Sequence, residues 1–134
     1  MKRLLPAAIL GLLLLGSGCA TVNHCREGDR LVVDITNTGW YLLNFIPLAS
    51  GNPAHPNAFG CKIFRQTVTL ENNMTMLENE LERLGATSYR NIISHTADEN
   101  ILFILFKRHS CHTSAELVFD DAPEGKLPCV SPNQ

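Results

Sequence analysis

The chain has 134 residues, a formal net charge of −2 and a charged fraction of 18%, and it contains five cysteines. Its length is that of one domain rather than two. Nucleic-acid binding needs a basic face, so the near-neutral charge balance excludes nucleic acid as an expected partner.

The first 18 residues have the pattern of a signal peptide. Lys2 and Arg3 form a short basic region, and residues 4–15 are an apolar run of 12 residues interrupted only by a proline and a glycine. Such a run is too short to cross the roughly 30 Å hydrocarbon core of a bilayer, which needs about 20 residues. It is typical of the hydrophobic region of a signal peptide. Small residues (GSG) then lead directly to Cys19.

The segment that ends at Cys19 resembles the lipobox of bacterial lipoproteins. In that family the cysteine thiol receives a diacylglycerol, cleavage before the cysteine makes it the first residue, and its amino group is usually acylated too. The resemblance implies that residues 1–18 are a lipoprotein signal peptide and that Cys19 is the lipidation site. One position departs from the family pattern, since Gly16 stands where the family prefers leucine. The alternative is a secreted protein in which Cys19 is an ordinary cysteine.

The lipid on Cys19 makes a membrane the first expected partner. Each buried methylene contributes about 0.8 kcal/mol and one chain holds only marginally, so two or three acyl chains make release negligible. Ala20, rather than an aspartate, follows the cysteine. The sorting rule of lipoproteins in diderm bacteria then implies the outer membrane. We therefore expect a domain in the cell envelope, on the periplasmic face of the outer membrane, with a covalent lipid on Cys19 and no cofactor.

The mature chain is predicted to begin with a polar tether over residues 19–30. Residues 31–36 alternate β-branched and more polar side chains, which predicts a strand, and residues 40–47 predict a second strand that a proline ends. Residues 48–60 hold clusters of glycine, proline and asparagine and indicate a long loop. Residues 61–68 allow a third strand.

The clearest predicted element is an amphipathic helix over residues 70–84. Its apolar residues recur at alternating spacings of four and three, which places them in one stripe along one face; they are Leu70, Met74, Leu77, Leu81 and Leu84. Thr69 is a suitable N-cap and Gly85 a suitable left-handed cap at the other end. The polar residues of the helix, Asn73 and Glu80 among them, are expected to face water.

After the helix, the pattern predicts a hairpin and a last strand. We expect a strand at 88–95, a turn at 96–100, a strand at 101–106, a tight turn at 109–112 and a strand at 113–119. The six consecutive apolar residues of 101–106 predict a central strand that is covered on both faces. Residues 120–134 form a proline-rich tail.

These elements make residues 31–119 an α+β domain. It is a small antiparallel sheet, in the order β-β-(β)-α-β-β-β, packed on one amphipathic helix. The helix end at Leu84-Gly85-Ala86 with the strand and hairpin after it, and the stretch 40–53, resemble small envelope lipoproteins that include the TRL-like group. That resemblance implies a fold and a location and carries no catalytic residue.

Four cysteines remain once Cys19 carries lipid: Cys25, Cys61, Cys111 and Cys129. An even number in an oxidising compartment favours two disulfides, each worth about 2–4 kcal/mol. Three pairings are possible, and chain reach permits Cys111–Cys129, which would leave Cys25–Cys61. Free or metal-bound thiols are the alternative.

The segment 109–112 (HSCH) is a candidate metal site. If Ser110 and Cys111 are the central residues of a hairpin turn, His109 and His112 lie opposite each other, with Cβ atoms roughly 4.5–5.5 Å apart. Two imidazoles and a thiolate form half of a zinc or copper site. The alternative is a polar turn with solvated histidines. His95 is expected at the far end of this hairpin, out of reach.

The sequence lacks the familiar catalytic motifs, such as G-x-S-x-G, H-E-x-x-H and the P-loop. We therefore expect a non-catalytic envelope lipoprotein with a structural or protein-interaction role and an envelope protein as partner. The candidate interaction surface holds Trp40, Tyr41 and Phe45, unless Trp40 belongs to the core. The alternative function is a periplasmic metal or small-ligand binding protein that uses His109, Cys111 and His112.

Overall fold

The structure, a computed structural model, describes residues 19–28, 30–58, 60–101 and 105–120. Its elements in chain order are β1 (Ala20–Glu27), β2 (Arg30–Leu42), β3 (Ile46–Gly51), β4 (Cys61–Ile63), α2 (Leu70–Leu84), β5 (Ser88–Ile101) and β6 (Phe106–Val118). The predicted α+β class is confirmed, with one helix and an antiparallel six-stranded sheet among the described residues. Four strands precede the helix and two follow it, which differs from the predicted distribution.

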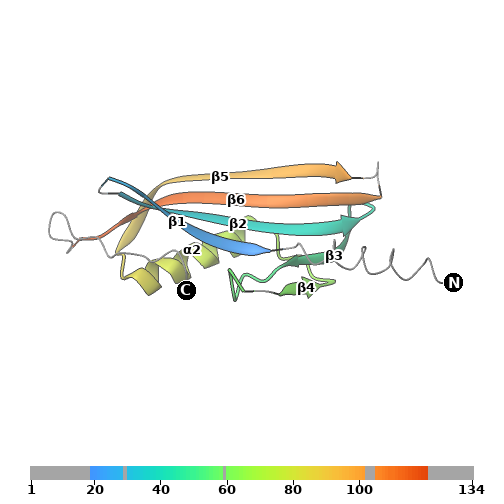
Figure 1. Ribbon diagram of the computed structural model, residues 1–134, viewed down its shortest axis with the longest axis horizontal. Coiled ribbons are helices and arrows are strands. Elements are labelled where there is room, and N and C mark those ends of the chain that lie inside the picture. Colours follow the sequence, from blue (N-terminus) through green and yellow to red (C-terminus); the bar gives the residue numbers. More distant parts are fainter. Residues whose placement is uncertain (1–18, 29, 59, 102–104, 121–134) are drawn as a thin grey trace, which may run out of the picture.

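Strand β2 pairs with three other strands. The sheet order is β4-β3-β2-β6-β5, and β1 pairs with β2 off this path. β1 pairs with residues 30–37 of β2 and β3 with residues 39–42, so these two strands follow each other along one edge of β2 while β6 occupies the other edge. Figure 1 shows β5, β6 and β2 as long neighbours, with β3 and β4 at one end of the molecule.

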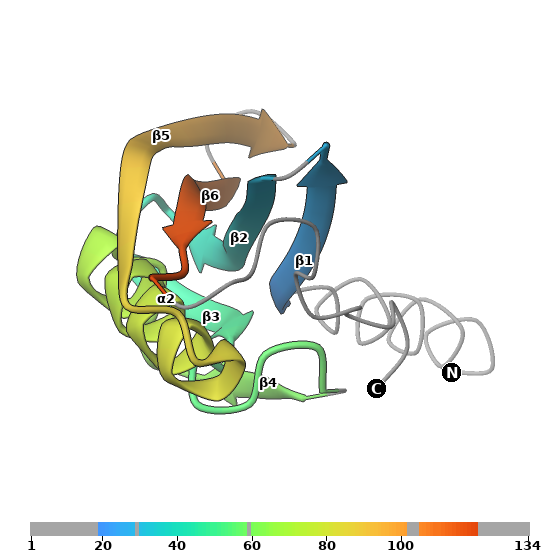
Figure 2. The same ribbon diagram turned by 90° about the vertical axis from the view of Figure 1, so that its left-hand side faces the viewer.

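The core lies between α2 and one face of the sheet. Leu31, Val33 and Ile35 of β2 point to that face because side chains alternate along a strand. Met76 and Leu77 of α2 belong to the same buried cluster. Figure 2 shows the sheet curled around the side on which the helix lies.

Helix α2 confirms its predicted bounds and caps. The Thr69 hydroxyl accepts a hydrogen bond from the first turn, and Gly85 ends the helix with φ 69°. The buried face differs from the predicted stripe, because Leu70 is 50% exposed whereas Asn73 and Glu80 are buried.

Asn73 and Glu80 are buried because both have partners. Asn73 Nδ2 donates to the carbonyl oxygen of Cys111 at 2.9 Å. Glu80 Oε1 contacts His24 Nε2 at 2.5 Å and accepts from Arg83 Nε at 2.9 Å. A buried polar group costs little only when it is hydrogen-bonded. These contacts also tie the helix to β6 and β1.

A strand replaces the tether predicted over residues 19–30. Residues 20–27 form β1 and pair antiparallel with β2. Ala20 and Val22 are buried in the core, and the polar side chains toward the end of β1 are exposed. The polar composition of this segment did not predict a strand, because a strand needs few apolar residues when only one of its faces is covered.

A turn divides the strand predicted over 40–47. β2 ends at Leu42 and β3 begins at Ile46. Leu43 and Asn44 have φ values of 51° and 68°. Two successive positive φ angles are the geometry of a tight hairpin turn, which asparagine tolerates and leucine rarely adopts. The composition gave no sign of this turn.

The polar segments predicted as turns at 96–100 and 109–112 lie inside the long β5–β6 hairpin. Their residues face each other across the ladder, as Asp98 pairs with His109. The main-chain hydrogen bonds of so long a ladder outweigh the local turn preference of polar residues.

The apolar segment 101–106 is not the central strand that its composition predicted. β5 ends at Ile101 and β6 begins at Phe106, and residues 102–104 lie outside the described residues. β5 is an edge strand, and β2 and β6 take the inner positions. Leu105 is 53% exposed, so burial on both faces does not explain this run. Most of the predicted tail, from residue 121 on, also lies outside the described residues.

Candidate functional site

Cys19, the predicted lipidation site, lies directly before β1 and against β2. Its carbonyl oxygen accepts hydrogen bonds from the backbone N–H and the hydroxyl of Thr38, each at 3.0 Å. Its Sγ is 3.7 Å from Thr38 Oγ1, and the residue is exposed. The thiol is accessible while the backbone that carries it is held by the sheet.

Close packing fixes the start of β1. A Cβ at Gly51 would lie 2.4 Å from the nitrogen of Ala20 and 2.5 Å from the carbonyl carbon of Cys19, so glycine is needed there. On another side, the backbone N–H of Asn57 donates to the Ala20 oxygen at 2.8 Å. The Asn57 side chain bonds the N–H and the C=O of Val22, each at 2.9 Å.

The four cysteines that the structure describes are free: Cys19, Cys25, Cys61 and Cys111. The Cys25–Cys61 disulfide is therefore not formed, and Cys129 lies outside the described residues. Cys111 is fully buried, and burial raises the pKa of its thiol. A thiol held in its protonated form is a poor nucleophile and a poor metal ligand.

The segment 109–112 does not bring together the predicted metal ligands. It lies within β6, where His109 and His112 are three residues apart and therefore point to opposite faces of the sheet. Cys111 shares the face of His109 and is buried. Within the part of the chain that the structure describes, no group of three or more His, Cys, Asp or Glu residues is placed to hold a metal ion.

His109 belongs to a cross-strand polar cluster. Its Nδ1 contacts Asp98 Oδ1, and Lys107 Nζ is 2.8 Å from Asp98 Oδ2. The hydrogen bonds from His109 and then Lys107 lower the pKa of the Asp98 carboxyl. Tyr41 lies edge-on to the His109 ring, with centroids 6.1 Å apart. We assign this cluster to the stability of the hairpin, because each partner is placed by strand register.

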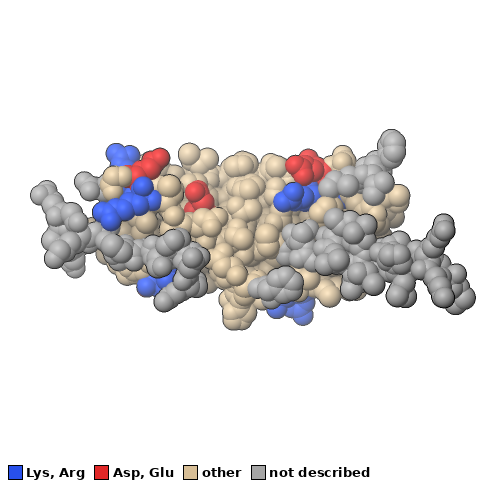
Figure 3. All heavy atoms as spheres, viewed as in Figure 1, with Lys and Arg blue, Asp and Glu red and all other residues tan. Residues whose placement is uncertain are grey.

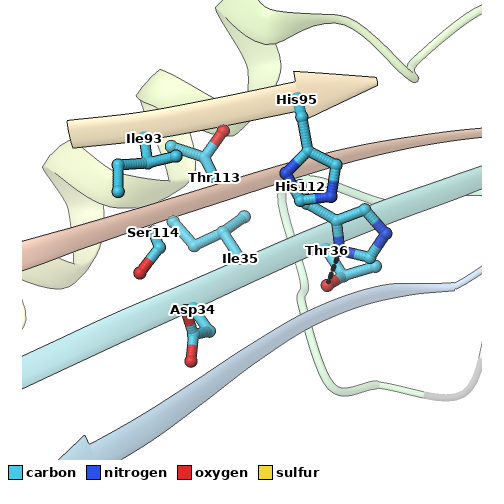
Figure 4. A pocket seen from close by; sticks show the side chains of 8 residues that line it. All are labelled: Asp34, Ile35, Thr36, Ile93, His95, His112, Thr113 and Ser114. Atoms are coloured by element: carbon cyan, nitrogen blue, oxygen red, sulfur yellow. Dashed lines mark hydrogen bonds between the residues drawn. The ribbon is translucent and has the colours of Figure 1, made fainter. Parts of the chain in front are cut away.

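His112 lines a shallow hollow on the sheet face opposite α2 (Figure 4). Its ring stacks on His95 with centroids 4.9 Å apart, so the expectation that His95 is out of reach is wrong. Its Nδ1 is 2.9 Å from Thr36 Oγ1. Burial, followed by the neighbouring His95 and Arg108, lowers the pKa of His112.

The hollow has a volume of about 340 Å³, and its lining is Asp34, Ile35, Thr36, Ile93, His95, His112, Thr113 and Ser114. Hydroxyls, imidazoles and a carboxylate offer hydrogen bonds to a small polar molecule. A site that binds small molecules tightly encloses most of its ligand, and this hollow is only partly enclosed.

Trp40, Tyr41 and Phe45 do not form one surface. Trp40 and Tyr41 are neighbours in β2 and point to opposite faces. Tyr41 is buried and Trp40 half-buried, whereas Phe45 is 72% exposed in the turn after β2. Phe45 instead lies at an end of the molecule that carries further exposed apolar residues. The sequence pattern did not group these residues, because they come from separate segments of the chain.

Comparisons of this chain with protein families, with curated proteins and with solved structures returned no match. Among the described residues, no helix has the length and apolar character needed to span a bilayer. The GSGC pattern that ends at Cys19 and the hydrogen bonds around this residue are features of the chain that bear on function.

Proposed function

We propose that this chain is a non-catalytic, lipid-anchored envelope protein with a structural or protein-interaction role on the periplasmic face of the outer membrane. One observation carries the proposal: the GSGC pattern ends at Cys19, and the sheet begins at Ala20. Cleavage before Cys19 leaves β1, which begins at Ala20, complete, and Cys19 itself is exposed for acylation.

The anchor in this proposal is very short. Thr38 already holds the carbonyl oxygen of Cys19, so no flexible segment separates the acylated residue from the sheet. Two or three acyl chains on Cys19 would hold the domain against the bilayer surface rather than at a distance from it.

The interaction role is supported by β5. It is an edge strand of 14 residues whose outer side pairs with no other strand among the described residues. Residues 91–100 are all exposed. An exposed strand edge offers unpaired N–H and C=O groups to an added strand, so we propose that the envelope partner binds there by strand addition.

The anchor is tested by the intact mass of the full-length protein purified from membranes of a diderm bacterial host. We expect residues 19–134 plus a diacylglyceryl group and a further acyl chain. Cys19→Ala is expected to lose the lipid mass and to retain residues 1–18, because the peptidase acts on the modified cysteine of the lipobox. Cys25→Ala, which removes another exposed cysteine, is the matched control and is expected to keep the lipid. Wild-type protein without lipid on Cys19 refutes the proposal.

A further inference from the structure

Five large apolar side chains are exposed at one end of the sheet. We call this set the apolar end; its members are Leu43, Phe45, Ile63, Phe64 and Leu105. They come from the β2–β3 turn, the end of β4 and the residue before β6, which lie at one end of the molecule in Figure 1. The Leu43 N–H donates to the Leu105 oxygen at 3.0 Å, so the β2–β3 turn contacts the residue before β6. The Phe64 N–H donates to the Leu48 oxygen of β3 at 3.3 Å, which holds the end of β4 against the strand that follows this turn.

Two members of the apolar end have an unfavourable backbone. Leu43 has φ 51° and Phe64 has φ 54°, in the left-handed region that bulky residues rarely adopt. Phe64 is 71% exposed, so no burial of its ring offsets this conformation in water. Exposed apolar patches and residues with a strained backbone are both typical of surfaces that bind a ligand, a protein or a membrane.

The apolar end lies beside the proposed anchor. Gly51 touches the backbone of Cys19 and pairs with Cys61 at the start of β4. Ile63 is two residues further along β4, or about 7 Å at 3.3 Å per residue. A lipid on Cys19 and the side chains of Ile63 and Phe64 therefore reach the same layer of a bilayer.

The charges beside the apolar end favour a lipid surface as its binding partner. Lys62 and Arg65 flank Ile63 and Phe64, and neither forms an ion pair within the described ranges. The exposed acidic residues of α2 lie under the other part of the sheet; they are Glu71, Glu78 and Glu82. Figure 3 shows acidic and basic side chains beside each other at both ends of this view, with an uncharged middle. Toward the end of β5, Asp98 and Glu99 are paired with Lys107 and Arg108. Basic residues beside exposed aromatic rings are typical of surfaces that sit in anionic headgroups.

We propose that the apolar end sits in the headgroup layer of an anionic phospholipid bilayer, next to the lipid on Cys19. This inference rests on the proposed anchor. Anchor and apolar end together fix the orientation of the domain, with β4 and the connection before β6 on the membrane. The first half of β5, residues 88–95, then lies away from the membrane, because β5 reaches the apolar end only at Ile101, which pairs with Phe106.

The test is hydrogen–deuterium exchange on the full-length lipidated protein. It is reconstituted in vesicles of phosphatidylethanolamine and phosphatidylglycerol, and compared with vesicles of phosphatidylcholine and with detergent. We expect the amides of residues 43–46 and 62–65 to be protected in vesicles, most strongly with phosphatidylglycerol. The amides of residues 88–95 in β5 are expected to exchange alike in all three.

A double variant identifies the side chains. Phe45→Ser with Phe64→Asn removes both rings, and asparagine tolerates the left-handed φ of Phe64. We expect it to lose the vesicle-dependent protection. The matched control is Ile92→Ser with Ile93→Ser, which removes two exposed apolar side chains of β5 and is expected to keep the protection.

Each other outcome overturns the inference. Lipidated protein without protection at the apolar end shows that the domain does not rest on this surface, and it leaves the proposed lipid anchor on Cys19 unaffected. Protection in detergent that grows with protein concentration shows that a second copy covers the apolar end. A protein mass without lipid on Cys19 removes the anchor and the proposed orientation together.

Discussion

At the scale of single residues, Gly51 is the position where two backbones leave no room for a side chain. We expect Gly51→Ala to lower the free energy of unfolding by about 1–3 kcal/mol, because its Cβ would overlap the backbone at Cys19 and Ala20. Urea denaturation measures this. Gly60→Ala is the control, since nothing lies within 4 Å of its Cβ, and it is expected to change stability little. Equal effects of the two substitutions would contradict the close approach.

His112 gives the fold a dependence on pH. Its pKa is lowered in the folded state by burial and then by His95 and Arg108, so the fold favours the neutral ring. This contribution to stability is fully present above the unfolded pKa of about 6.5 and is lost as pH falls toward the lowered folded value. We expect thermal stability to fall below about pH 6.5, and to fall less steeply in His112→Gln.

His55→Gln is the control for this pH dependence, because His55 is exposed in the segment between β3 and β4. It is expected to follow the wild-type profile. A His112→Gln profile with the wild-type slope would assign the pH dependence to other groups, of which Glu80 and Asp98 have lowered pKa values and act at lower pH.

At the scale of elements, the buried amide of Asn73 joins α2 to β6. Its Nδ2 donates to the Cys111 oxygen at 2.9 Å and lies 3.2 Å from Thr113 Oγ1. Asn73→Ala leaves these buried acceptors without their donor, so we expect a loss of about 1–3 kcal/mol in the free energy of unfolding. Asn79→Ala, on the exposed face of the same helix, is expected to be nearly neutral. Chemical denaturation of both variants separates the contribution of the Asn73 hydrogen bonds from the change in helix propensity that both substitutions share.

The helix was predictable because its signals are local. Capping by Thr69, the left-handed Gly85 and a spacing of four and three all lie within one short segment. The face that it buries was not predictable, because Asn73 and Glu80 owe their burial to partners on β6 and β1. Similarly, β1 and the ends of the β5–β6 hairpin depend on pairing across the sheet, which local composition does not encode.

At the scale of the whole molecule, the candidate sites also differ in whether their signals are local in the sequence. Cys19 is proposed as the lipidation site from a contiguous motif. The apolar end was missed because Leu43, Phe64 and Leu105 are far apart in sequence and meet only through the sheet topology. Leu105 belongs to the apolar run at 101–106, for which the sequence predicted a strand covered on both faces, and the 53% exposure of Leu105 contradicts that prediction for this residue.

In the proposed orientation, the anchor and the length of β5 together limit how far the free edge of the sheet stands from the membrane. β5 has 14 residues and ends at Ile101, beside the apolar end, so its start lies at most about 46 Å further from the lipid, at about 3.3 Å per residue. Thr38 holds Cys19 against the sheet, so a flexible link does not add to this distance. A partner that adds a strand to β5 therefore has to present it within about 5 nm of the lipid surface, which favours partners that lie close to the same membrane.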